Sequence, residues 1–128
     1  MEQSEFEQLV IDAIDALPEA GKKAMTNVAF FVEPQVRTAK ANEAHITRDE
    51  LLLGLYEGVS LAERGDSYFG ALPDKITIFQ EPIELLSQGN PAKLKELVFD
   101  VVRHEVGHHL GFNEPDIREY DAVHSRVL

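Results

Sequence analysis

Three residues in the C-terminal third of the chain have the types and spacing of a metal-dependent hydrolytic site. His104, Glu105 and His108 lie in the run HEVGHHLG. On a helix of 3.6 residues per turn, side chains four positions apart are separated by about 40° around the axis, so both imidazoles point the same way. Neutral imidazole nitrogens bind zinc at about 2.0–2.1 Å. We therefore predict that His104 and His108 hold a single Zn²⁺ ion.

Glu105 follows the first of these histidines and would lie beside the metal. A carboxylate at that position can take a proton from a metal-bound water and pass it to a leaving amine. The metal would lower the pKa of the water toward about 7 and polarise the scissile carbonyl. Peptide hydrolysis at neutral pH requires this combination, so Glu105 is predicted to be the general base.

A third protein ligand must come from outside this helical turn. A catalytic zinc site uses three protein ligands and one open position, and the chain contains no cysteine. Gly111 allows the helix to end and the chain to turn back toward the metal. The spacing His-x-x-x-His-x-x-Gly-x-x-acid puts Glu114 at the third position. We predict Glu114 as the third ligand, with Asp116 or a ligand from elsewhere as the alternatives.

Several other polar residues near the motif have more ordinary interpretations. His109 lies about 100° around the helix from His108, which favours a supporting or core histidine over a ligand. Asp100, one turn before His104, could accept a hydrogen bond from the far nitrogen of a ligand histidine. Three tyrosines could each stabilise an oxyanion, and the sequence does not choose among them: Tyr56, Tyr68 and Tyr120.

The element that carries the motif is predicted to be a helix over 90–111. Asn90 can cap it, and Pro91 suits the first helical position. An apolar stripe leads toward the motif: Leu94, Leu97, Val98, Val101 and Val102. His104 and His108 continue this stripe, since each lies seven residues after one of its members.

The rest of the chain mixes helical and extended patterns. Segment 5–17 has the apolar spacing of an amphipathic helix, and another turn or two should follow Pro18. The pattern predicts strands at 28–33 and 75–80, and favours an extended course at 51–59. The other expected elements are a loop at 34–46, a helix at 81–88 and a last helix from near Pro115 to the C-terminus. These elements predict an α+β fold, with a small sheet and packed helices, in a single domain over 1–128.

Composition restricts the environment and the partners. The 128 residues are 44% hydrophobic and 27% charged, which is ordinary for a globular protein. The chain has no apolar run near the 18–20 residues or so of a membrane span, and its first residues lack the features of a signal peptide. We therefore expect a cytoplasmic protein with no membrane partner. The net charge of −11 disfavours nucleic acid as a partner.

Three longer runs resemble the minimal zincin-like metallopeptidases of bacteria, over roughly 6–117. These are LLGLYEGVSLAER at 52–64, LPDKITIFQEPIE at 72–84 and RHEVGHHLGFNEPDI at 103–117. The resemblance implies a zincin-like fold with a short mixed sheet, zinc on His104 and His108, and Glu105 as general base. The family usually has aspartate at the position of Glu114, where this chain has the longer glutamate. Zinc chemistry does not explain the first two runs, which makes them independent support for the resemblance.

The sequence therefore predicts a zinc peptidase that acts on peptides or unfolded protein segments. A substrate could add to an exposed sheet edge, for which 75–80 is the candidate. One alternative is a metal-binding or protein-interaction module that hydrolyses nothing, and another is a hydrolase of non-peptide amides. Glu105 favours a hydrolase, because a purely structural metal site has no need of a base. The sequence leaves the oligomeric state open.

Overall fold

The computed structural model of the chain describes residues 1–37, 51–58, 74–110 and 125–127. The helices in these ranges are α1 (Gln3–Asp15), α2 (Glu19–Ala24), α4 (Gln80–Ser87) and α5 (Pro91–Leu110). The strands are β1 (Val28–Glu33), β2 (Leu51–Glu57), β3 (Asp74–Phe79) and β4 (Ser125–Val127). The predicted α+β class is confirmed, and the ambiguous segment at 51–59 contains a strand.

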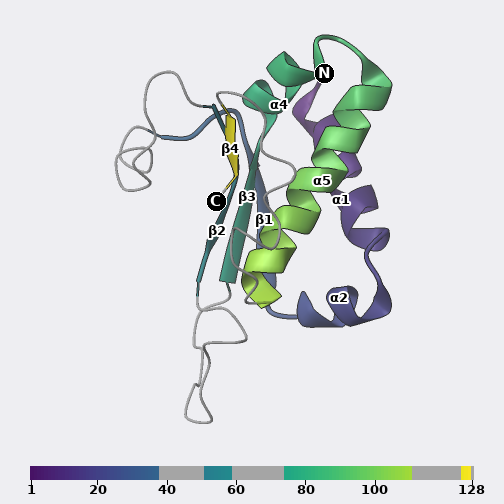
Figure 1. Cartoon of the computed structure of the whole chain (residues 1–128), viewed down its shortest axis with the longest axis vertical. Helices are drawn as coiled ribbons and strands as arrows, with labels where there is room; N and C mark the ends of the chain where they lie inside the picture. The colour runs from purple at the N-terminus through teal and green to yellow at the C-terminus, as the bar shows by residue number, and fades with distance from the viewer. Residues whose placement is uncertain (38–50, 59–73, 111–124, 128) are drawn as a thin grey trace.

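The strands form one mixed sheet in the order β1-β3-β2-β4 (Figure 1). Strand β3 pairs in parallel with β1 and antiparallel with β2, while β4 pairs in parallel with β2. The prediction that 75–80 forms an exposed edge is wrong, because β3 is central. Alternating apolar residues indicate which face of a strand is buried, but they do not indicate how many neighbouring strands it has.

Helices α1 and α5 cover one face of the sheet, with α5 lying along the strands (Figure 1). The apolar stripe of α5 meets the inward side chains of β3, as its periodicity predicts. The centre of this core is fully or almost fully buried: Phe6, Val10, Leu53, Ile76, Ile78, Ile83, Val98, Val101 and Val102. Burial of this apolar surface attaches α5 to the sheet and sets the direction in which its polar residues point.

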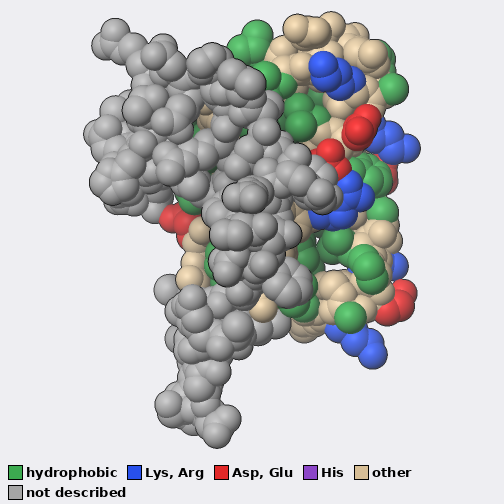
Figure 2. All heavy atoms as spheres, in the orientation of Figure 1, with side chains coloured by type: hydrophobic (Ala, Val, Ile, Leu, Met, Phe, Trp, Pro, Cys, Tyr) green, Lys and Arg blue, Asp and Glu red, His purple; other side chains and the backbone are tan. Residues whose placement is uncertain are grey.

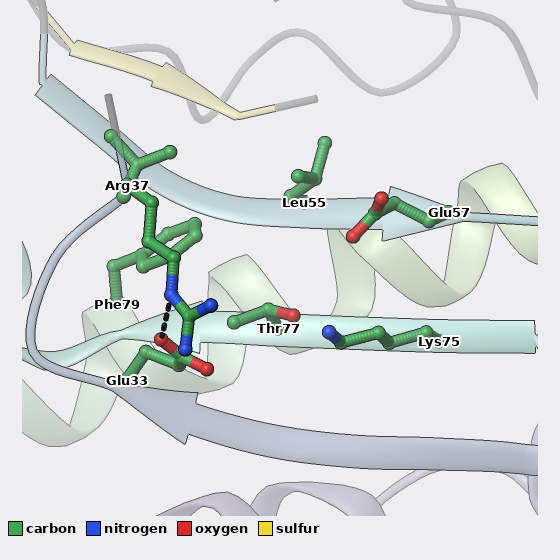
Figure 3. A pocket seen from close by; sticks show the side chains of 8 residues that line it. Glu33, Arg37, Leu55, Glu57, Lys75, Thr77 and Phe79 are labelled. Atoms are coloured by element: carbon green, nitrogen blue, oxygen red, sulfur yellow. Dashed lines mark ion pairs between the residues drawn. The ribbon is translucent and has the colours of Figure 1, made fainter. Parts of the chain in front are cut away.

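The opposite face of the sheet carries polar and charged side chains. Alternation along β3 directs Lys75, Thr77 and Phe79 away from the helices. With Leu55 and Glu57 of β2 they line a shallow pocket, seen in Figure 3 with the helices behind the sheet. The pocket also includes an ion pair between Arg37 and Glu33, whose N and O atoms are 3.9 Å apart. This pocket is separated from α5 by the sheet.

The start of α5 is fixed by a side-chain cap. The Asn90 Oδ1 atom accepts hydrogen bonds from the backbone N–H groups of Ala92 at 3.0 Å and Lys93 at 3.2 Å. Both bonds satisfy donors that lack a partner within the helix. The predicted cap at Asn90 and first helical residue at Pro91 are therefore confirmed.

The predicted last helix is wrong over 125–127, which form β4. Three residues with one β-branched side chain carry little local signal, and pairing with β2 decides their conformation. The start of that helix near Pro115, the stop at Gly111 and most of the loop at 34–46 lie outside the described residues.

The surface visible in Figure 2 mixes side chains of both signs with apolar ones over the described helices. Among the described residues, no helix combines the length and the apolar character that a membrane crossing requires.

Candidate functional site

Helix α5 brings His104, Glu105 and His108 together near its C-terminal end. His104 and Glu105 are both 0% exposed, and His108 is half-buried. The rings of His104 and His108 have centroids 5.0 Å apart and an interplanar angle of 65°. The two imidazoles therefore lie on one side of the helix, one turn apart, as their spacing requires.

The separation of the two rings suits a shared zinc ion. With nitrogen ligands at about 2.0–2.1 Å and tetrahedral angles, two imidazole centroids would lie about 5 Å apart. The observed centroid separation matches this value. Two imidazole nitrogens with a carboxylate close by are also a set of donor groups that zinc accepts. The residues present therefore fit a zinc ion.

A complete ligand set cannot be assembled from the described residues alone. Within those ranges, no three His, Cys, Asp or Glu side chains are placed to hold one metal ion. Both candidates for the third ligand, Glu114 and Asp116, lie outside the described residues. His45 and His124 lie outside them as well.

Glu105 lies where α5 approaches the sheet most closely. A Cβ atom added to Gly54 of β2 would lie 2.8 Å from Val101 Cγ1, 3.2 Å from Glu105 Cγ and 3.3 Å from Glu105 Oε2. Gly54 therefore leaves the room in which the Glu105 side chain sits. The pairing of β2 with β4 is irregular between Leu52 and Gly54, next to this contact. The sequence showed Gly54 only as a glycine inside an apolar strand, without its role.

The burial of His104 and Glu105 argues against a purely structural helix. Removing an imidazole and a carboxylate from water costs free energy, which apolar residues at these positions would avoid. Both lie next to buried valines on the same helix, Val101 and Val106. Such polar burial is typical of a functional site.

His109 faces a different part of the molecule. It is 1% exposed, its Nδ1 atom lies 2.7 Å from Asp74 Oδ2, and its Nε2 atom lies 2.9 Å from the carbonyl oxygen of Ala24. The expectation of a supporting or core histidine is confirmed. Sequence reasoning missed Asp74, although the LPDK run that contains it was already unexplained by zinc chemistry.

Two other sequence candidates can also be located. The hydroxyl of Tyr56 donates to Asp74 Oδ2 at 2.6 Å. This tyrosine therefore bonds to the same carboxylate oxygen that lies next to His109. Tyr68 and Tyr120 lie outside the described residues. Asp100 accepts a hydrogen bond from Arg103, one turn along the same helix. One oxygen of the Asp100 carboxylate is thus engaged by an arginine, and its support of a ligand histidine stays a prediction.

Comparison with known proteins agrees with this geometry. The family model described as zincin-like metallopeptidase matches residues 25–123, which include β1, β2, β3, α4 and α5. No curated protein matches the chain. The matched range contains His104, Glu105, His108 and Glu114. Since the match extends over most of its length, the chain belongs to the zincin-like metallopeptidase family.

Proposed function

We propose that this protein is a zinc-dependent peptidase in which His104 and His108 hold the metal and Glu105 is the general base. The observation that carries the proposal is the pair of imidazoles one helical turn apart, with centroids 5.0 Å apart. Glu105 lies buried between them in sequence. Membership in a family of metallopeptidases supports the same reaction class.

Zinc and Glu105 would have separate roles in the reaction. When bound, zinc supplies a Lewis acid that activates water and polarises a carbonyl. Glu105 would accept a proton from the attacking water at its carboxylate and deliver it to the leaving amine. Val101 and Gly54 pack close to Glu105, whose side chain is fully buried, and they exclude bulk water from one side of that carboxylate. Proton transfer would then be directed to the reacting groups.

The proposed substrate is a peptide or an unfolded protein segment. Strand β3 is internal to the sheet, so it cannot receive a substrate strand as the sequence suggested. In the described part of the chain, the outer strands of the sheet are β1 and β4. Of these two, β4 lies next to β2, the strand that contacts Glu105.

Metal content and hydrolysis test the proposal together. We expect about one zinc per chain by mass spectrometry, and cleavage of peptides from a mixed library followed by the same method. Glu105→Gln keeps the size of the side chain and removes its basicity. We expect this variant to retain zinc and to lose at least about 100-fold in cleavage rate. Full activity in the variant would remove Glu105 from the mechanism. Zinc uptake without any cleavage by the wild-type protein would favour the non-catalytic module.

The third ligand needs a separate measurement. If Glu114 binds zinc, Glu114→Ala should weaken zinc affinity by about tenfold or more in competition with a chromophoric chelator. Asp116→Ala provides the matched comparison, since it removes a carboxylate two residues further on. Loss of affinity in Asp116→Ala alone would transfer the assignment to Asp116.

A further inference from the structure

His109 connects the end of α5 to two other elements through both nitrogens of its ring. The Nε2 atom lies 2.9 Å from the carbonyl oxygen of Ala24, at the end of α2. A carbonyl oxygen only accepts, so Nε2 carries a hydrogen and donates it. The Nδ1 atom lies 2.7 Å from Asp74 Oδ2 in β3. Two bare acceptors do not approach this closely, so a proton lies between these two atoms.

The carboxylate of Asp74 is itself held in place. The Tyr56 hydroxyl donates to Oδ2 at 2.6 Å, and the backbone N–H of Asp74 donates to the carbonyl oxygen of Asn27 at 3.2 Å. Asp74 is 2% exposed. Its carboxylate is therefore an acceptor with a fixed position. Because this acceptor is held by other elements, it determines the orientation of the His109 ring.

Gly58 completes the packing around Asp74. Its φ angle is +154°, and a Cβ atom added there would lie 2.5 Å from Asp74 Cγ. An L-residue would be strained in this conformation and would also collide with the carboxylate. The backbone at Gly58 can therefore approach Asp74 this closely only because position 58 is a glycine. We name the group formed by Ala24, Tyr56, Asp74 and His109 the polar clamp.

We propose that the polar clamp is a positioning device that holds the last turn of α5, and thereby keeps His108 at the correct distance from His104 for one metal ion. This role rests on the proposed function, because it requires that His104 and His108 bind zinc. None of the clamp residues belongs to the proposed ligand set. They act on the metal site through the peptide bond that joins His108 to His109.

The location of the clamp explains why such a device is needed. Helix α5 ends at Leu110, so His108 belongs to its last turn, where the final carbonyl groups lack partners within the helix. Helix ends fray, and a shift of a few tenths of an ångström is enough to spoil a metal site. His104 lies one turn deeper and is fully buried, so it needs less help. The clamp acts at this last turn, next to the half-buried His108.

An apolar residue at position 109 would fill the same space without this effect. Apolar contacts have no directional preference, whereas two hydrogen bonds at opposite sides of one ring fix both its position and its orientation. Buried polar networks often specify one arrangement rather than add stability. The buried His109 and Asp74 fit that role, because their bonds reach α2, β2 and β3 from a single helical turn.

The test uses Asp74→Asn in the full-length chain, because asparagine keeps the volume of the side chain and removes its charge. We expect zinc affinity to fall by about tenfold or more, measured by competition with a chelator. In the metal-free Asp74→Asn variant, we expect faster hydrogen exchange of the amides of residues 107–110 than in the metal-free wild type. The matched control is Val98→Ala, which weakens the packing of the same helix nearly two turns before His104. It should lower the melting temperature and leave both the zinc affinity and the exchange of the last turn unchanged.

The outcomes separate this inference from the proposed function. If Asp74→Asn binds zinc as tightly as the wild type does, the positioning role is overturned. An equal loss of affinity in Asp74→Asn and Val98→Ala also overturns it, because general destabilisation would then suffice. If the wild-type protein takes up no zinc, the proposed function fails. The clamp is then judged by exchange alone, and unchanged exchange of the last turn in Asp74→Asn refutes it.

Discussion

Two adjacent residues of the same type, His108 and His109, have opposite surroundings. His108 is half-buried and its ring lies against that of His104, while His109 is buried and hydrogen-bonded through both ring nitrogens. One position along a helix corresponds to a rotation of about 100°, which is enough to direct the two rings to different environments. The difference shows that one turn of α5 combines a metal-binding side and a side that fixes the helix in the fold.

The two sides also differ in what surrounds them. The described groups around His109 are protein donors and acceptors from three other elements, and all of their side chains lie within the core or at its margin. The side of His104 and His108 presents two imidazoles at a spacing that suits zinc. We infer that affinity for zinc depends mainly on the side of His104 and His108, and that stability without zinc depends mainly on the side of His109. Substitutions at each side should therefore have different consequences.

The sharpest test of this comparison exchanges each histidine in turn for alanine. His108→Ala should weaken zinc binding by at least about 100-fold, because it removes one of the metal ligands. The melting temperature of the metal-free protein should change little, since this side chain is only half-buried. Both quantities are measured on the same samples, by chelator competition and by calorimetry.

His109→Ala should give the reverse pattern. It leaves the carboxylate of Asp74 buried beside a cavity, and breaking a buried pair of this kind costs about 3–5 kcal/mol. The free energy of unfolding without zinc should therefore fall far more than in His108→Ala. Equal losses of metal-free stability in the two variants would contradict the division between the two sides. So would a larger loss of zinc affinity in His109→Ala than in His108→Ala.

The sequence was sufficient for the features that depend on local spacing. A short run of β-branched and aromatic residues located β1, alternation located β3 within one residue, and the cap at Asn90 marked the start of α5. The four-residue spacing of His104 and His108 was enough to place both rings on one side of a helix. Each of these features is decided by residues within one or two turns, so a single stretch of sequence contains the information.

Features that depend on distant partners were missed. Asp74 and His109 are 35 residues apart in the chain, and Tyr56 is 18 residues from Asp74. No periodicity connects them, although the LYEG and LPDK runs stood out as unexplained by zinc chemistry. The central position of β3 and the strand at 125–127 also depend on pairing between distant segments. These are contacts for which tertiary structure, rather than local preference, is decisive.

The last prediction concerns the tight contact between β2 and Glu105, on the metal side of the comparison. A methyl group at Gly54 would lie 2.8 Å from Val101 Cγ1 and 3.2 Å from Glu105 Cγ. Because Val101 is β-branched and buried, it cannot swing away, and Gly54→Ala should cost about 1–3 kcal/mol of stability. Displacement of the Glu105 carboxylate should also lower the cleavage rate by about tenfold, with zinc content unchanged.

The double variant Gly54→Ala/Val101→Ala separates these two effects. Removing the Val101 methyl groups makes room for the new one, so most of the lost stability should return, as measured by calorimetry. The contact with Glu105 remains, so the cleavage rate should stay low. If activity returns together with stability, the effect of Gly54→Ala passes through helix packing alone. Low activity at restored stability would instead show that β2 sets the position of the general base directly, through the contact of Gly54 with Glu105.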